Sequence, residues 1–187
     1  MTLEALLRAA CDALRDTGVP FMLTGSVATA FHGASRATMD VDFVIDPTMA
    51  QLDLLVTRIV ASGAYVSLEA AHDAFRTRAM FNVIDPDTGW KADLIIRKDR
   101  PFSVMEFERR ETAEFFGTVI HVATLEDVVL SKLEWAKLGG SARQLDDVRG
   151  LLRIRAGDVD LAYIERWVDV LGVRAQWQFA STDDGRS

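Results

Sequence analysis

The chain has 187 residues, of which nearly half are apolar and about a quarter charged, an ordinary composition for a soluble globular protein. Its net charge of −7 argues against sequence-independent binding of long nucleic acids, which depends on a basic surface. No apolar run approaches the ~20 residues that cross a bilayer, and early acidic residues argue against a signal peptide at the start of the chain. A lone cysteine, Cys11, excludes an internal disulfide, so we expect a cytoplasmic protein with no membrane segment.

Apolar residues at helical intervals predict an opening helix over 3–16. A Gly-Val-Pro sequence ends it, and a short apolar run that follows is typical of a buried strand. The elements expected next are a strand over 21–23, a helix over 26–32, a strand over 41–45 and a helix over 49–60.

A hairpin is the next expected feature. Alternating apolar residues over 74–83 predict a strand that carries Arg76 and Arg78 on its polar face. A strong turn signal at 85–89 precedes a second apolar strand over 90–96. The two strands should therefore pair in an antiparallel hairpin.

Helical periodicity dominates the last third of the chain. A strand over 119–122 should be followed by helices over 125–138, 142–155 and 160–171. We therefore expect an α+β fold, with a mixed β-sheet flanked by helices and a C-terminal helical segment. The expected domains are a core over 1–122, a helical segment over 123–180 packed on the core, and a disordered tail over 181–187.

Two aspartates mark the start of the strand over 41–45. Side chains alternate along a strand, so Asp40 and Asp42 share one face while their neighbours enter the core. Close carboxylates repel each other unless a cation compensates them, and Mg²⁺ prefers carboxylate and phosphate oxygens. A bare Asp-x-Asp pair is common, however, and taken alone it is more often simply solvated.

Gly25 and Ser26 lie where the buried strand over 21–23 meets the start of the next helix. Unpaired N–H groups at a helix start attract anions, Gly25 lets a phosphate approach the backbone, and the Ser26 hydroxyl can donate to it. The competing interpretation of Ser26 is an ordinary helix cap. Together with the two aspartates, the pair indicates a site for a metal and a phosphate.

Asp93 supplies a third carboxylate within the otherwise apolar strand over 90–96, where a charge is costly unless it is matched. If this strand lies beside that of Asp40 and Asp42, the three carboxylates could hold two metal ions about 3.5–4 Å apart. Asp93 is then the candidate that polarises an acceptor hydroxyl. The alternative is an edge-strand aspartate that faces water.

The glycine–serine pair and the three aspartates resemble the motif of the DNA polymerase β-type nucleotidyltransferase superfamily. Arg36-x-Thr38-x-Asp40-x-Asp42 is similar to the form carried by small bacterial nucleotidyltransferase-like proteins, including toxin-type members of abortive-infection systems. The resemblance covers roughly residues 20–96.

This resemblance implies transfer of a nucleotidyl group from a nucleoside triphosphate, with release of pyrophosphate and with Mg²⁺ or Mn²⁺ as the cofactor. It implies that Asp40, Asp42 and Asp93 are the catalytic, metal-binding residues. Gly25, Ser26 and Arg36 are the candidates for nucleotide binding in this part of the chain.

Lys132 lies within the apolar stripe of the expected helix over 125–138, where a lysine needs a partner or a path to solvent. The surrounding stretch, with Asp147 in the next helix, is similar to a C-terminal pattern of the same bacterial proteins. By that resemblance Lys132 binds triphosphate oxygens, and Asp147 orients Lys132 or Arg143. The alternatives are a lysine that extends along the surface and a plain helix-surface aspartate.

Three functions remain open at this point. The leading hypothesis is an enzyme that moves a nucleoside monophosphate to a hydroxyl on RNA, a protein or a small molecule. The second is a non-catalytic nucleotide sensor or partner protein of the same fold, as in a toxin–antitoxin pair. The third is a glycosyltransferase, although the chain is short and the glycine–serine pair suits a triphosphate better. An antitoxin partner and a homodimer through the apolar stripes of the C-terminal helices are also left open.

Overall fold

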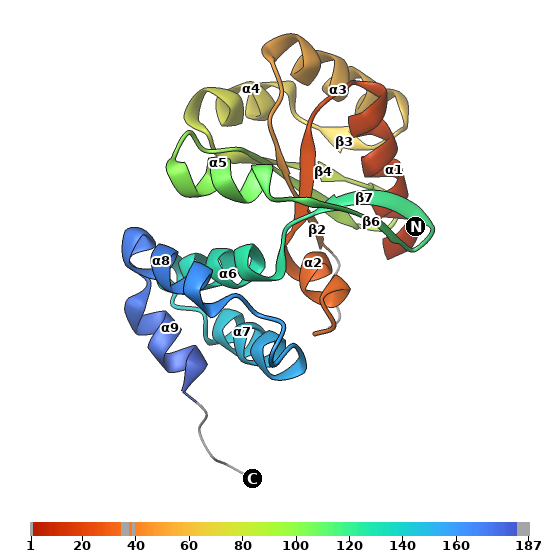
Figure 1. Ribbon diagram of the computed structural model, residues 1–187. Coiled ribbons are helices and arrows are strands. Elements are labelled where there is room, and N and C mark those ends of the chain that lie inside the picture. Colours follow the sequence, from red (N-terminus) through yellow and green to blue (C-terminus); the bar gives the residue numbers. More distant parts are fainter. Residues whose placement is uncertain (1, 35–37, 39, 183–187) are drawn as a thin grey trace. The chain divides into compact units, whose positions relative to one another are not determined.

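The computed structural model describes residues 2–34, 38 and 40–182 (Figure 1). Arg36, the candidate phosphate ligand, and residues 183–187 of the expected tail lie outside the described residues. The chain divides into two compact units. The first takes the described residues of 1–27 and 37–123, and the second takes those of 28–36 and 124–187.

The first unit is built on a mixed sheet, which has seven strands within the described residues, in the order β3-β4-β5-β2-β1-β7-β6 (Figure 1). Among these strands, β2 runs parallel to β5 and β1 parallel to β7, while the other neighbours are antiparallel. The strands are β1 (Phe21–Thr24), β2 (Asp40–Ile45), β3 (Tyr65–Val66), β4 (Met80–Ile84), β5 (Lys91–Ile96), β6 (Glu111–Phe115) and β7 (Thr118–Val122).

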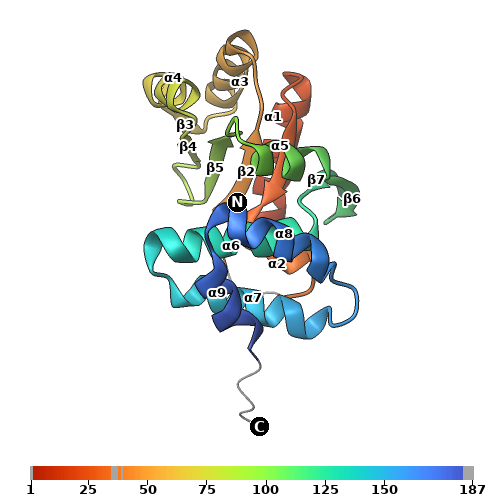
Figure 2. The ribbon, with the colours of Figure 1, turned by 60° about the vertical axis from the view of Figure 1, so that its left-hand side comes forward.

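Three helices of the first unit, α1 (Leu3–Asp16), α3 (Met49–Ala61) and α4 (Leu68–Thr77), lie next to one another (Figure 2), with α1 in contact with β2, β5 and β7. Each begins at a hydroxyl side chain, of Thr2, Thr48 or Ser67, that accepts a hydrogen bond from a first-turn N–H. A further helix, α5 (Pro101–Glu108), follows β5 in the chain and begins with a proline, whose fixed φ suits the first helical turn.

The second unit consists mainly of helices α6 (Leu125–Gly139), α7 (Ala142–Ile154), α8 (Leu161–Leu171) and α9 (Arg174–Ser181). Helix α6 contacts the other three, and apolar residues such as Leu130 and Leu133 on it are buried. The short helix α2 (Gly25–Phe31) begins in the first unit and ends in the second. Within the described residues, no helix combines the length and the apolarity that crossing a membrane requires.

The predicted α+β fold, a mixed sheet flanked by helices, is confirmed. The helices expected over 3–16, 49–60 and 125–138, and the strands over 21–23 and 41–45, are present with their ends shifted by no more than one or two residues. The expected elements did not include the short β3, α5, β6 or α9. Ser181, expected in the tail, is the last residue of α9.

The first strand of the predicted hairpin was partly wrong. Residues up to Thr77 belong to helix α4, and only Met80–Ile84 pair with β5. The alternation was misleading because Ala71 and Ala74, buried three residues apart, define a helical face. Arg78 ends the helix in the left-handed conformation, with φ at 53°. Arg76 and Arg78 therefore do not share a strand face.

Candidate active site

A row of polar side chains crosses four neighbouring strands. Asp42 on β2 is the direct partner of Asp93 on the parallel strand β5. Thr24 on β1 is the partner of Asp42, and Asn82 on β4 is the partner of Asp93. Residues directly opposite each other on strands about 4.8 Å apart present their side chains on the same face of the sheet. The row therefore runs Thr24, Asp42, Asp93, Asn82.

Asp93 is the most buried carboxylate of this row, with 7% of its surface exposed. It accepts one hydrogen bond from the side-chain amide of Asn82, and another, 3.1 Å long, from Nζ of Lys91. Strand β5 lies between β4 and β2, so Asp93 is on an interior strand and not on an edge facing water. The charge that looked costly in an apolar strand is matched by these two donors.

Asp40 and Lys91 form the next row, since they are partners on β2 and β5. Nζ of Lys91 lies 3.8 Å from Oδ2 of Asp40 as well as 3.1 Å from Oδ2 of Asp93. Burial by itself would lower the pKa of Lys91, but the hydrogen bond to Asp93 and the charges of Asp93, Asp40 and Asp42 together raise it above its usual value. Lys91 is therefore an ammonium ion held among three carboxylates.

Gly25 lies directly against the side chain of Asp42. Its φ is +64°, and a Cβ at this position would lie 2.0 Å from Oδ2 and 2.9 Å from Cβ of Asp42. Only glycine combines that conformation with that space. The group that lies against Gly25 in this structure is the Asp42 carboxylate, and the expected approach of a phosphate to this backbone stays a prediction. Ser26 follows in α2 with 9% of its surface exposed.

The expected metal ligands are of the chemical type that binds a divalent ion, but only two of the three carboxylates lie side by side. Carboxylate oxygens are the hard donors that Mg²⁺ prefers, and Asp42 and Asp93 are side by side. In the part of the chain that the structure describes, however, no group of three or more Asp, Glu, His or Cys side chains is gathered closely enough to hold a metal ion. The cation beside Asp40 and Asp93 is Lys91.

The second unit brings Lys132 and Asp147 together. Lys132 on α6 is 3% exposed, and its Nζ lies 2.7 Å from Oδ2 of Asp147 and 3.1 Å from Oε1 of Gln144, both on α7. Lys132 therefore does not extend along the surface, and the side chain of Asp147 is only 11% exposed. Asp146, the neighbouring aspartate, is exposed and pairs with Arg149.

Sequence reasoning missed three polar members of the two rows, Thr24, Asn82 and Lys91. The register of β5 against β2 and β4 brings them beside the aspartates, and register depends on pairings that a single sequence does not display. One signal was available for Lys91, because Lys91 and Asp93 are two residues apart on one strand and must share a face.

No family model matches the sequence, and no curated protein matches it. Solved structures do match. The solution structure of the antibiotic-resistance factor ANT(2'')-Ia has a TM-score of 0.56 and 13% identity, over 95% of this chain and 92% of that one. An antigenic nucleotidyltransferase-like protein from Paracoccidioides brasiliensis has a TM-score of 0.57 and 16% identity, over 95% and 91% of the chains.

The crystal structure of ANT(2'')-Ia in complex with adenylyl-2''-tobramycin is also similar, with a TM-score of 0.57 and 14% identity, over 95% of this chain and 99% of that one. At these identities the likeness shows the fold alone. The chain therefore has the nucleotidyltransferase fold, as the resemblance of its glycine–serine and aspartate motif implied.

Proposed function

We propose that the protein transfers a nucleoside monophosphate from a nucleoside triphosphate to an acceptor hydroxyl, with release of pyrophosphate. The observation that carries the proposal is the register of Asp42 and Asp93, which makes two carboxylates neighbours on interior strands beside Gly25. The nucleotidyltransferase fold of the similar structures supports the same reaction.

The reaction assigns a role to each residue of the rows. Asp40, Asp42 and Asp93 would hold Mg²⁺ or Mn²⁺, which supplies positive charge to the triphosphate oxygens when bound. Asp93 accepts the proton of the acceptor hydroxyl, whose oxygen then bonds to the α-phosphorus while the bond to the pyrophosphate oxygen breaks. Lys91 must leave at least one carboxylate when a metal binds, because its ammonium lies beside both Asp40 and Asp93.

The proposed nucleotide ligands are Gly25, Ser26, Arg36 and Lys132. Gly25 and Ser26 follow β1 next to Asp42, which supports a triphosphate close to the metal ligands. The ion pair of 2.7 Å with Asp147 supports an orienting role of that carboxylate on Lys132. A buried, hydrogen-bonded ammonium is a point charge suited to phosphate oxygens.

The kind of molecule that supplies the acceptor hydroxyl is proposed from the charge of the chain and from the similar structures. The net charge of −7 disfavours a long nucleic acid, although RNA and protein acceptors stay within the proposal. One of the similar ANT(2'')-Ia structures is a complex with adenylyl-2''-tobramycin. Small molecules that carry hydroxyl groups, with tobramycin first, are therefore the acceptors to test before RNA or protein.

The decisive experiment is magnesium-dependent release of pyrophosphate from each of the four ribonucleoside triphosphates, with cell extract as the source of acceptors. Asp42→Asn keeps the shape of the side chain and removes a metal-binding charge, so release should vanish. Asp12→Asn is the matched control, since Asp12 is exposed on α1 and pairs with Arg15 of the same helix. Equal release from the wild type and Asp42→Asn would sink the proposal.

A second candidate is a nucleotide-binding or partner protein of the same fold that does not catalyse transfer, such as one component of a toxin–antitoxin pair. Lys91 favours it, because its ammonium already compensates the carboxylates. Exposed apolar side chains of the second unit, among them Trp135, Leu138 and Val170, are accessible to an antitoxin or a second copy. Metal-dependent binding of ATP without pyrophosphate release would support this candidate.

A further inference from the structure

A cavity of about 500 Å³ lies between α1 and α3, within the first unit. Ala92 and Leu94 of β5 line it, and they flank Asp93, whose side chain points to the other face of the strand. The cavity is therefore on the opposite face of the sheet from the candidate active site, and it is independent of the proposed function. Its volume falls within the 300–1,000 Å³ range of small-molecule sites.

Small side chains create the space. Alanine and glycine fill less space than the larger apolar residues around them, so they leave a partly open hollow between the helices. Four leucines, Ile59 and Val83 form the rest of the apolar wall, and a Cβ added at Gly63 would meet nothing within 4 Å. The small residues that line the cavity are Ala9, Ala10, Ala13, Gly63, Ala64 and Ala92.

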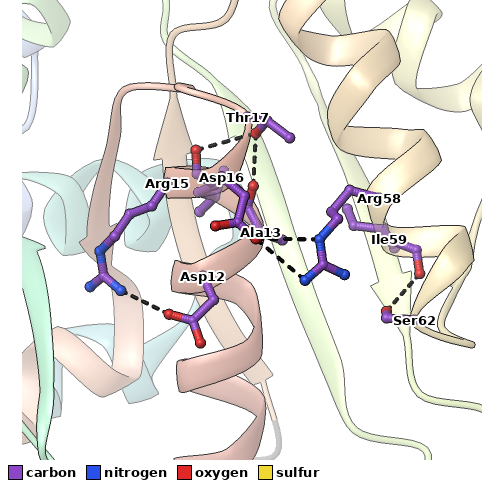
Figure 3. A network of polar contacts seen from close by, with 9 residues as sticks. Asp12, Ala13, Arg15, Asp16, Thr17, Arg58, Ile59 and Ser62 are labelled. Carbon is purple, nitrogen blue, oxygen red and sulfur yellow. Dashed lines mark hydrogen bonds and ion pairs between the residues drawn. The ribbon is translucent and has the colours of Figure 1, made fainter.

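Polar contacts hold the two helices beside the cavity (Figure 3). The guanidinium of Arg58 on α3 donates two hydrogen bonds of 3.3 Å to Oδ2 of Asp16 at the end of α1. The side-chain amide of Gln51 on α3 donates to the carbonyl of Gly18, 2.6 Å away. Both contacts tie α3 to the end of α1 and to the turn after it, so the helices frame the cavity at a set spacing.

One end of the cavity carries a buried carboxylate without a counter-charge. Asp85 is 8% exposed, and its oxygens accept hydrogen bonds from the backbone N–H of Asp87, at 3.3 Å, and from the hydroxyl of Thr88. Among the described residues, no lysine, arginine or histidine forms an ion pair with it. Buried charges in proteins are normally paired, so this position favours a cation from outside the chain.

Toward a ligand, the polar side chains that line the cavity act as acceptors. The hydroxyl of Thr88 already donates to Asp85, and the hydroxyl of Ser62 donates to the carbonyl of Ile59 at 2.7 Å (Figure 3). The carboxylates of Asp85 and Asp87 are acceptors. A matching ligand must therefore place a donor here and an apolar group among the alanines.

We propose that this cavity binds a small primary amine with an apolar body. Its ammonium lies against Asp85 and Asp87, and its apolar part fills the space lined by Ala10, Ala13 and Ala92. Charge complementarity selects the amine over the corresponding alcohol or acid.

Isothermal titration at pH 7 with three probes of one shape tests the proposal: phenethylamine, phenethyl alcohol and 3-phenylpropionate. The amine should bind about tenfold more tightly than the alcohol, the margin expected for a charged hydrogen bond, and the carboxylate should bind least. Ala10→Leu, which fills the cavity, should abolish binding, while Ala70→Leu on the exposed face of α4 should not.

Asp85→Asn and Asp87→Asn should each remove most of the preference for the amine over the alcohol. Asp87 is exposed, so its variant keeps the test valid if Asp85→Asn fails to fold. Equal affinity for the amine and the alcohol would overturn the proposal. So would unchanged amine binding by Ala10→Leu, or the lack of binding of the amine at millimolar concentration to the folded wild type.

Discussion

The ammonium of Lys91 lies 3.1 Å from Oδ2 of Asp93, on the same strand and the same face of the sheet. It is also 3.8 Å from Oδ2 of Asp40 on the neighbouring strand. Three carboxylates this close to one another would repel if nothing compensated them. The chain thus supplies its own cation to the position where a divalent metal is proposed to bind, and the metal must compete with it.

Lys91→Gln should show whether Asp40, Asp42 and Asp93 serve mainly to pair with Lys91 or to bind a metal ion. Without metal the variant should be less stable than the wild type, because the carboxylates lose their counter-charge. Its affinity for Mn²⁺ should rise by about tenfold, because a like charge that pairs with two of the proposed metal ligands is removed. Electron paramagnetic resonance of Mn²⁺ titrations without nucleotide measures this affinity. Lys98→Gln, an exposed position just after β5, is the control, and an unchanged or weaker Mn²⁺ affinity in Lys91→Gln would contradict the competition.

The sequence was sufficient to place the carboxylates on strands but not to place the strands beside each other. Alternation fixes Asp40 and Asp42 on one face, because side-chain direction is a local property of a strand. That Asp93 is the partner of Asp42 depends on a parallel pairing between segments almost fifty residues apart. Such pairing is set by the packing of whole strands, so Asn82 and Thr24 could not be found in advance.

The error over 74–79 has a different origin. Phe75 and Thr77 fit an alternating strand pattern, and the same residues fit a helix in which Ala71 and Ala74 face the core. A short apolar stretch does not distinguish the two-residue repeat of a strand from the 3.6-residue repeat of a helix. The deciding signals were the cap at Ser67, whose hydroxyl accepts a hydrogen bond from the N–H of Ala70, and the pairing of Met80–Ile84 with β5.

Gly25→Ala should destabilise the protein more than the same change at another glycine of similar conformation. Gly25 and Gly89 have φ values of +64° and +72°, so both variants force an alanine into the left-handed region, at about 1–2 kcal/mol. At Gly89 a Cβ meets nothing within 4 Å, whereas at Gly25 it would collide with the side chain of Asp42. Urea unfolding should therefore show a clearly larger loss for Gly25→Ala, and Asp42 should be displaced with it.

The Gly25 comparison also bears on function. If the position of Asp42 matters for metal binding, Gly25→Ala should weaken Mn²⁺ binding while Gly89→Ala leaves it unchanged. Equal losses of stability in the two variants would mean that the contact between Gly25 and Asp42 is easily relieved, which contradicts the close packing described above.

Asp147→Ala should cost about 3–5 kcal/mol of stability, because it removes the carboxylate that lies 2.7 Å from the buried ammonium of Lys132. Asp146→Ala at the adjacent position should cost less than about 1 kcal/mol, since Asp146 is exposed and its pair with Arg149 is on the surface. Thermal or urea unfolding of the two variants measures the difference. Similar costs would show that the pair with Lys132 is no stronger than a surface ion pair.

Nucleotide affinity tests the further role proposed for Lys132. Lys132→Met should weaken binding of ATP with metal, beyond any effect of lower stability, when affinity is measured well below the unfolding temperature. Lys137→Met on the same helix is exposed and should not change the affinity. An unaltered ATP affinity in Lys132→Met would restrict the lysine to a structural role.

Cys11 should make stability depend on pH in the alkaline range. Burial raises the pKa of its thiol to about 11, more than the nearby Arg15 lowers it, whereas the thiol of the unfolded chain ionises near 9. Between these values the unfolded state binds fewer protons than the native state, so the free energy of unfolding falls as the pH rises. The Cys11→Ala variant has no thiol, so its stability lacks this dependence on pH.

The variant should unfold with a smaller free energy than the wild type because packing is lost. This difference in the free energy of unfolding should be constant below pH 8 and should shrink between pH 9 and 11. Urea unfolding at a series of pH values measures this difference, and a constant value up to pH 10.5 would mean that the thiol ionises as freely in the folded protein as in the unfolded chain.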